Sequence, residues 1–182
     1  MVFYLDTMHL LDCKGVAALV CGGALSLLLR SRALGDNTAE RLSEINELLG
    51  EYCDSRPGSN RLPRIKQTNL KADGWWELHG VCFKAGNTRT SIPAFYELCQ
   101  RFLTGGSVEE TTAINILKHM TKVYELLYME PIFMSDEDVH AQFRDATLAF
   151  GREYQRARQL ARRRNVLAWK SPPRCTKCST WC

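Results

Sequence analysis

Apolar residues recur every three or four positions along most of the chain, which indicates amphipathic helices rather than strands. The pattern predicts helices over residues 16–32, from 37 to about 52, from 91, over about 107–130, and from 135 through an arginine-rich stretch near the C-terminus. We therefore expect an all-α fold, a bundle of about six to nine helices arranged in two helical subdomains.

Three polar residues mark where these helices should begin. Asn37, followed by a glutamate three residues later, forms an N-x-x-E variant of the capping box, and Ser107 forms a full one. Ser91 should start a further helix, with Pro93 in its first turn, where proline is tolerated. These signals fix the expected starts of three helices.

Breaks in the pattern divide the chain into four expected parts. Residues 1–55 form an N-terminal helical subdomain, and 56–90 a basic linker and connecting segment that is rich in proline, glycine and polar residues. Residues 91–168 form a C-terminal helical subdomain, and 169–182 a cysteine-containing tail.

The most apolar run, residues 15–29, is too short to span a bilayer comfortably but has the length of a signal-peptide core. Two acids offset the single lysine before it, so it lacks a positive leader. We favour a buried core helix over a signal or anchor. The eight cysteines then fit a reducing compartment better than a secreted disulfide protein.

Charge is unevenly placed along the 182 residues, whose net charge is +4. From residue 152 onward the chain has nine basic residues and one acid, so this part carries +8 and the preceding part −4. Such asymmetry points to a polyanion, either a nucleic acid or an anionic membrane surface, although a tail kept soluble by charge is also an interpretation. The candidate nucleic-acid-binding residues here are Arg152, Arg156, Arg158, Arg162, Arg163 and Arg164.

Helical geometry places Arg152, Arg156 and Arg163 within about 40° of one another, on a surface about 18 Å long. Arginine donates two hydrogen bonds to phosphate, and nothing in the pattern reads base edges, so binding should not depend on sequence. A membrane helix needs bulky apolar residues opposite its cations, and this stretch offers mainly alanines and Leu160. Nucleic acid is therefore favoured over membrane.

Other chemistry is weaker. Cys175, Cys178 and Cys182 have a spacing that could hold zinc, with a fourth ligand from His140, His119 or another distant residue, but thiols without a metal are the default. The pair at 75–76, both tryptophans, could stack on terminal bases, although a core or subunit contact is favoured. Because no nucleophile elbow, metalloprotease motif or phosphate-binding loop occurs, we expect no enzymatic activity and no cofactor apart from the candidate zinc.

Several stretches together resemble one family. They are "GALSLLLRSRALGDNTAERLSEINELLGEY", "NRLPRI", "PAFYELCQRF" and "VYELLYMEPIFMSDED", and they cover roughly residues 20–150. Their order and spacing are similar to the small closterovirus RNA-silencing suppressors of the beet-yellows type. The similarity lies in apolar positions and turns rather than in a signature motif, and the arginine stretch and cysteine tail exceed the family pattern.

The resemblance implies an all-helical viral protein that assembles into rings, binds small double-stranded RNA without sequence preference and so blunts host silencing. It implies a location in the host cytoplasm and also the nucleus. Arg61 and Arg64 match the family's basic-Pro-Arg-Ile turn, and Lys66 lies beside them. Two alternatives stay open: a helical adaptor for host proteins whose basic tail directs nuclear import, and a peripheral membrane protein anchored through residues 16–29.

Overall fold

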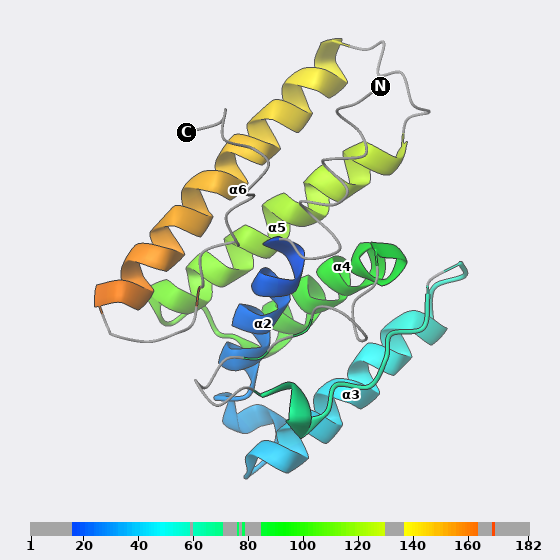
Figure 1. The fold of residues 1–182 in the computed structure, drawn as a ribbon, viewed down its shortest axis with the longest axis vertical. Coiled ribbons are helices and arrows are strands. Elements are labelled where there is room, and N and C mark those ends of the chain that lie inside the picture. The colour runs from blue at the N-terminus through cyan, green and yellow to red at the C-terminus, as the bar shows by residue number, and fades with distance from the viewer. Residues whose placement is uncertain are drawn as a thin grey trace.

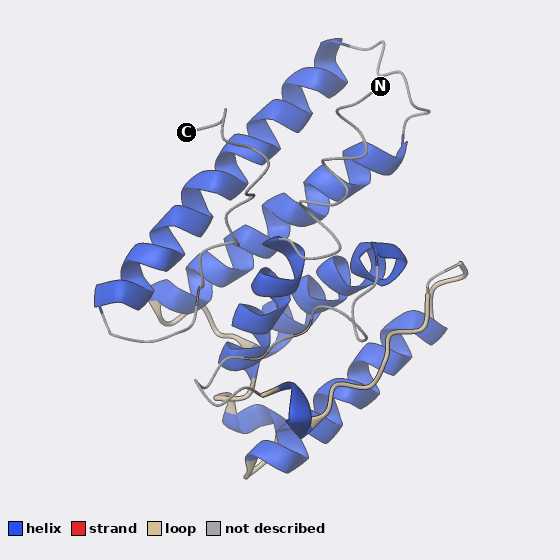
Figure 2. Ribbon diagram, viewed as in Figure 1, coloured by secondary structure: helices blue, strands red, loops and turns tan. Residues whose placement is uncertain are grey.

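The computed structural model describes residues 16–58, 60–70, 76, 78, 85–129, 137–163 and 169. Every regular element in these residues is a helix (Figure 2), which confirms the all-α prediction. Five of them are α-helices, so the expected six to nine are not confirmed. The elements are α2 (Val16–Leu28), η2 (Arg32–Leu34), α3 (Thr38–Asp54), η3 (Gln67–Asn69), α4 (Ala85–Phe102), α5 (Val108–Met129) and α6 (Glu137–Arg163), where η marks a 3-10 helix.

The two longest helices, α5 and α6, lie side by side and antiparallel along one side of the molecule (Figure 1). Helix α2 packs on both α4 and α5, while α3 packs on α4 at the opposite end of the molecule from α6. One hydrophobic cluster includes buried residues of all five α-helices. The subdomain boundaries expected from the sequence stay a prediction.

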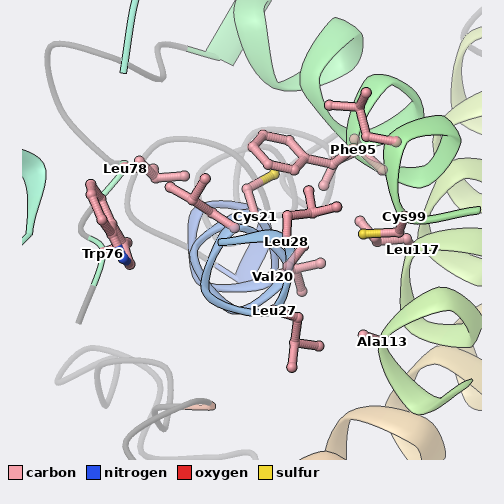
Figure 3. Close-up of a cluster of buried hydrophobic side chains, with 14 of the residues drawn as sticks. Val20, Cys21, Leu27, Leu28, Trp76, Leu78, Phe95, Cys99, Ala113 and Leu117 are labelled. Carbon is pink, nitrogen blue, oxygen red and sulfur yellow. The ribbon is translucent and has the colours of Figure 1, made fainter. Parts of the chain in front are cut away.

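Helix α2 is the centre of the core. All of its residues from Ala17 to Leu28 except Ser26 are buried. Figure 3 shows its side chains meeting α4 and α5 on one side, near Phe95 and Leu117, and Trp76 on the other. Burying one such leucine contributes about 1.5–3 kcal/mol, so this run is a major source of stability. The core-helix interpretation of this run is therefore confirmed for residues 16–28.

The sequence predicts that this first helix continues to Arg32, but it ends at Leu28. Arg41 of α3 accounts for the stop, because its guanidinium binds three carbonyl oxygens in the connection. Its Nη1 donates to Leu29 O at 2.8 Å, its Nε to Gly35 O at 2.7 Å and its Nη2 to Asp36 O at 2.9 Å. Gly35 has a φ of 138°, a backbone conformation that residues with a side chain rarely adopt.

The expected starts of α3 and α5 are confirmed. The Asn37 side chain accepts hydrogen bonds from the backbone N–H groups of Ala39 and Glu40, both at 3.0 Å. The Ser107 hydroxyl accepts from the N–H of Glu110 at 3.1 Å. Each bond satisfies a donor that the first helical turn leaves without an intrahelical partner.

The predicted start of α4 is wrong. The helix begins at Ala85, six residues before Ser91, and therefore contains Pro93 in its interior. Ser91 is buried, and its hydroxyl donates to Asn87 O at 2.9 Å, four residues earlier in the same helix. A serine whose hydroxyl bonds to the carbonyl four residues earlier is compatible with a helix interior. The serine and proline together therefore led to a wrong prediction of a helix start.

Candidate nucleic-acid interface

The inner face of α6 explains the orientation of its arginines. Ala146, Tyr154, Ala157 and Ala161 are buried, and α6 packs along α5. The Tyr154 ring stacks on Phe150 with centroids 5.7 Å apart and meets Trp169 edge-on at 5.9 Å. Burial raises the pKa of Tyr154 to about 12. The alanines let the two helices approach closely, and the aromatic ring fixes which face turns inward.

The opposite face of α6 is basic and open to solvent. We call Arg152, Arg156, Arg162 and Arg163 the basic face, because all four are exposed, with Arg162 on the arc that adjoins the other three. At 100° per residue, Arg163 points roughly 180° away from Tyr154. Arg158 lies at the edge, half-buried, with its Nη1 3.3 Å from Gln155 Oε1. Arg164 lies outside the described residues.

One acid, Glu153, lies among the arginines of residues 150–163. Its Oε1 is 4.0 Å from Arg156 Nη1, and its buried Oε2 has no hydrogen-bond partner among the described residues. Such a long pair with an exposed arginine contributes at most about 1 kcal/mol. Within the described residues no carboxylate lies within 4.0 Å of Arg152, Arg162 or Arg163, so no neighbouring acid offsets the positive charge of these three arginines.

Glu153 is half-buried and also acts electrostatically on His119 of α5. Burial, followed by the neighbouring Lys118, holds the pKa of His119 below its usual range, and Glu153 opposes that effect. Glu153 therefore interacts with His119 of α5 as well as with Arg156 of the basic face.

The second candidate set, Arg61, Arg64 and Lys66, lies on an extended segment that runs back along α3 (Figure 1). We call residues 60–70 the basic segment. Asn46 of α3 holds it through Ile65, whose N–H donates to Asn46 Oδ1 at 2.7 Å and whose carbonyl accepts from Nδ2 at 2.9 Å. All three cationic side chains are exposed, as a phosphate contact requires.

The surroundings of the basic segment reduce its attraction for a polyanion. Helix α3 presents five exposed acids at spacings of three or four residues, which we call the acidic ridge. They are Glu40, Glu44, Glu47, Glu51 and Asp54. Helical geometry gathers them within about 80° of one another. With Arg41 and Arg56 included, residues 38–70 carry five acids and five basic residues, so this end of the molecule has no excess of positive charge.

The structure therefore separates the two candidate sets. The basic face belongs to α6, which packs on α5, whereas the basic segment follows α3 at the other end of the molecule (Figure 1).

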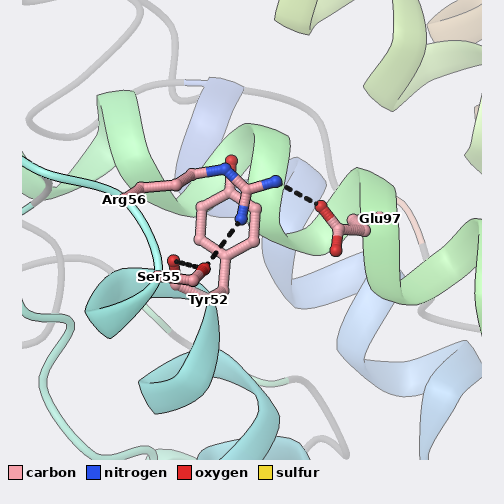
Figure 4. Close-up of polar contacts among 4 residues, drawn as sticks. All are labelled: Tyr52, Ser55, Arg56 and Glu97. Carbon is pink, nitrogen blue, oxygen red and sulfur yellow. Dashed lines mark hydrogen bonds and ion pairs between the residues drawn. The ribbon is translucent and has the colours of Figure 1, made fainter.

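Other arginines of the linker and of α3 already have partners. Figure 4 shows the Arg56 guanidinium lying over the Tyr52 ring. Its carbon is 3.7 Å from the centre of that ring. Its Nη2 is 2.7 Å from Glu97 Oε2, so this arginine joins the end of α3 to α4 beside a small cleft of about 250 Å³. Arg56 and Arg41 thus serve the fold, although a count of charges includes them with the candidates.

Most of the other candidate residues, those for zinc binding and base stacking, lie in parts of the chain that the structure does not describe. Cys175, Cys178, Cys182 and Trp75 lie outside the described residues. Trp76 is 4% exposed and packs in the core, which confirms the core interpretation for that member of the pair. Among the described residues, no group of three or more His, Cys, Asp or Glu side chains is arranged to hold a metal ion. No described helix has both the length and the apolar character of a membrane span.

Two features of the surface were not predicted. Asn46 positions the basic segment, but its partner is a backbone group, and backbone partners leave no pattern in a sequence. Gly151 and the exposed Leu148 lie on the flank of α6, between its packed side and the basic face. A glycine inside a long helix is a visible anomaly, since it weakens the helix relative to alanine. That signal was present in the sequence.

No protein-family model matches the chain, and comparisons with curated proteins and with solved structures also give no match. The resemblance to closterovirus silencing suppressors therefore stays a prediction.

Proposed function

We propose that this chain binds short double-stranded RNA through the basic face of α6, without sequence specificity, and sequesters it. The observation that carries the proposal is the position of the arginines. Arg152, Arg156 and Arg163 lie opposite the packed side of a 27-residue helix and Arg162 lies on the adjoining arc, all four exposed and almost without counter-charges. A row of exposed guanidinium groups suits backbone phosphates, which are regularly spaced and independent of sequence.

The basic segment is a weaker part of the interface in this proposal. Its three cations lie beside the acidic ridge, whose field opposes a polyanion at distances within a Debye length of about 10 Å. Arg61, Arg64 and Lys66 would add to binding only where bound RNA, or a second copy of the chain, brings phosphates onto that end of the molecule.

The biological role follows from the resemblance. A protein that coats small RNA duplexes would withhold them from a host silencing pathway, with no chemical step. We propose that the chain is such a viral suppressor, that it acts in the host cytoplasm and nucleus, and that it works as a homo-oligomer with a ring as the expected form.

The peripheral-membrane alternative loses its main support, because the apolar run on which it depends is buried in the core. The adaptor alternative uses the same arginines as a nuclear-import signal and predicts no RNA binding.

The test is fluorescence anisotropy with labelled short RNA duplexes of several unrelated sequences at one salt concentration. We expect similar affinities for all sequences. Removing two charges of the basic face in Arg152→Gln/Arg163→Gln should weaken binding to every duplex alike. The matched variant Arg32→Gln/Arg101→Gln removes two exposed charges elsewhere and should bind nearly as wild type does. Absence of binding by the wild type would favour the adaptor.

A further inference from the structure

Gly151 lies near the middle of α6 and is half-buried, on the flank of the helix between its packed side and the basic face. Nothing in the fold requires a glycine there. It does not belong to the described glycines with positive φ, and a Cβ atom added to it would meet no neighbouring atom within 4 Å. Glycine within a helix is less stable than alanine, so the fold alone would favour alanine at this position.

The missing side chain leaves a shallow depression on the surface of α6. Its walls include Leu148, Gln155 and the arginines Arg152 and Arg156 of the basic face. Leu148 is 57% exposed, and in the described residues only it and Val108 are large apolar side chains left so open. The depression thus combines bare backbone, one apolar side chain, an amide and two cations.

We propose that this depression seats the sugar–phosphate backbone of one RNA strand, with a ribose against Leu148 and adjacent phosphates on Arg152 and Arg156. This inference rests on the proposed function and adds that Gly151 determines how closely the strand approaches. Glycine is the residue that permits close approach between a backbone and a ligand. Amide side chains such as Gln155 can donate to phosphate and to the ribose 2′-hydroxyl.

The charges argue for a nucleic-acid strand rather than a protein in the depression. A protein partner typically covers a contiguous apolar patch. Here a single leucine is flanked by two exposed arginines, an arrangement that favours an anionic occupant.

The experiment uses two substitutions at this position, Gly151→Ala and Gly151→Met, and one matched control. Gly50 lies inside α3, and a Cβ atom there also meets nothing within 4 Å. The Gly151→Ala and Gly50→Ala variants should each raise the melting temperature by about 2 °C, because alanine is the better helix former. Circular dichroism during heating measures this effect.

RNA binding should separate the two positions. Gly151→Ala should weaken the affinity for a short RNA duplex about tenfold, because an added methyl group overpacks a close contact. Gly151→Met should weaken it further, and Gly50→Ala should leave it unchanged.

Wild-type affinity in both Gly151 variants would overturn the inference and leave the proposed function standing. A parallel loss of thermal stability and affinity in Gly151→Ala would also overturn it, since the glycine would then serve the fold. If the wild type binds no duplex, the proposed function fails and the inference fails with it. A protein that binds this depression and displaces the RNA duplex, with its binding weakened by Gly151→Met, would contradict the assigned occupant.

Discussion

Removing the Asn46 side chain should detach the basic segment from α3. The Asn46 carboxamide exchanges two hydrogen bonds with the backbone of Ile65, at 2.7 and 2.9 Å, and donates a third to Leu42 O at 2.8 Å. Ile65 is 2% exposed, so water cannot easily replace the lost partners. In Asn46→Ala both polar groups of Ile65 lose their bonds to this side chain.

The expected magnitude follows from these two bonds. Each contributes about 0.5–1.5 kcal/mol net, so we expect a loss of about 2 kcal/mol in the free energy of unfolding. For a chain of this size that corresponds to a fall of about 6 °C in melting temperature. The exchange of the Ile65 amide hydrogen should accelerate roughly 30-fold if the segment opens locally. Urea denaturation measures the first effect and hydrogen exchange the second.

Asn46→Asp provides the control, because an aspartate can still accept from the Ile65 N–H but cannot donate to its carbonyl. Because its second oxygen then faces the carbonyl oxygens of Leu42 and Ile65, we expect Asn46→Asp to lose at least as much stability as Asn46→Ala, while the Ile65 N–H keeps its acceptor. An unchanged exchange rate at Ile65 in Asn46→Ala, or an unfolding free energy equal to that of the wild type, would refute the assigned role of Asn46.

Two further predictions concern buried groups. Burial raises the pKa of the Cys21 and Cys99 thiols, so a thiol reagent at neutral pH should modify neither in the folded protein and both in denaturant, which peptide mass spectrometry can check. Modification of either one under native conditions would show that the core opens. The pKa of Tyr154 is about 12 in the folded chain against an ordinary value of 10.0, so its contribution to stability is complete below pH 10 and is lost as the pH rises through about 12. Tyr154→Phe should therefore lose less stability than the wild type between these pH values in alkaline denaturation, and identical curves would contradict the assigned burial.

Helix positions were largely predictable from the sequence because their signals are local. The caps at Asn37 and Ser107 involve residues only two or three positions away, and the apolar spacing of each helix fixes its inner face. The two errors have non-local or ambiguous causes. The residue that ends α2, Arg41, lies thirteen residues beyond Leu28. A serine followed by a proline, as at Ser91 and Pro93, can occur at a helix start or inside a helix, so the sequence alone does not distinguish the two.

The candidate interface was predictable to a similar degree. Helical geometry alone groups Arg152, Arg156 and Arg163, and the structure places these three side chains on the exposed side of α6. Charge counting could not distinguish them from Arg56, whose partner Glu97 lies 41 residues away. It also could not show that the basic segment runs beside the acidic ridge, because that proximity depends on the contact between Asn46 and Ile65.

The most direct test of the account is the salt dependence of RNA binding by the basic face. The logarithm of affinity for a short duplex should fall linearly with the logarithm of salt concentration, by about 0.9 per phosphate neutralised if RNA behaves as duplex DNA does. Arg152→Gln/Arg163→Gln should reduce that slope by about 1.8, while Arg32→Gln/Arg101→Gln should leave it unchanged. A slope that is the same in all three proteins, or a wild type that binds no duplex in dilute buffer, would contradict the account.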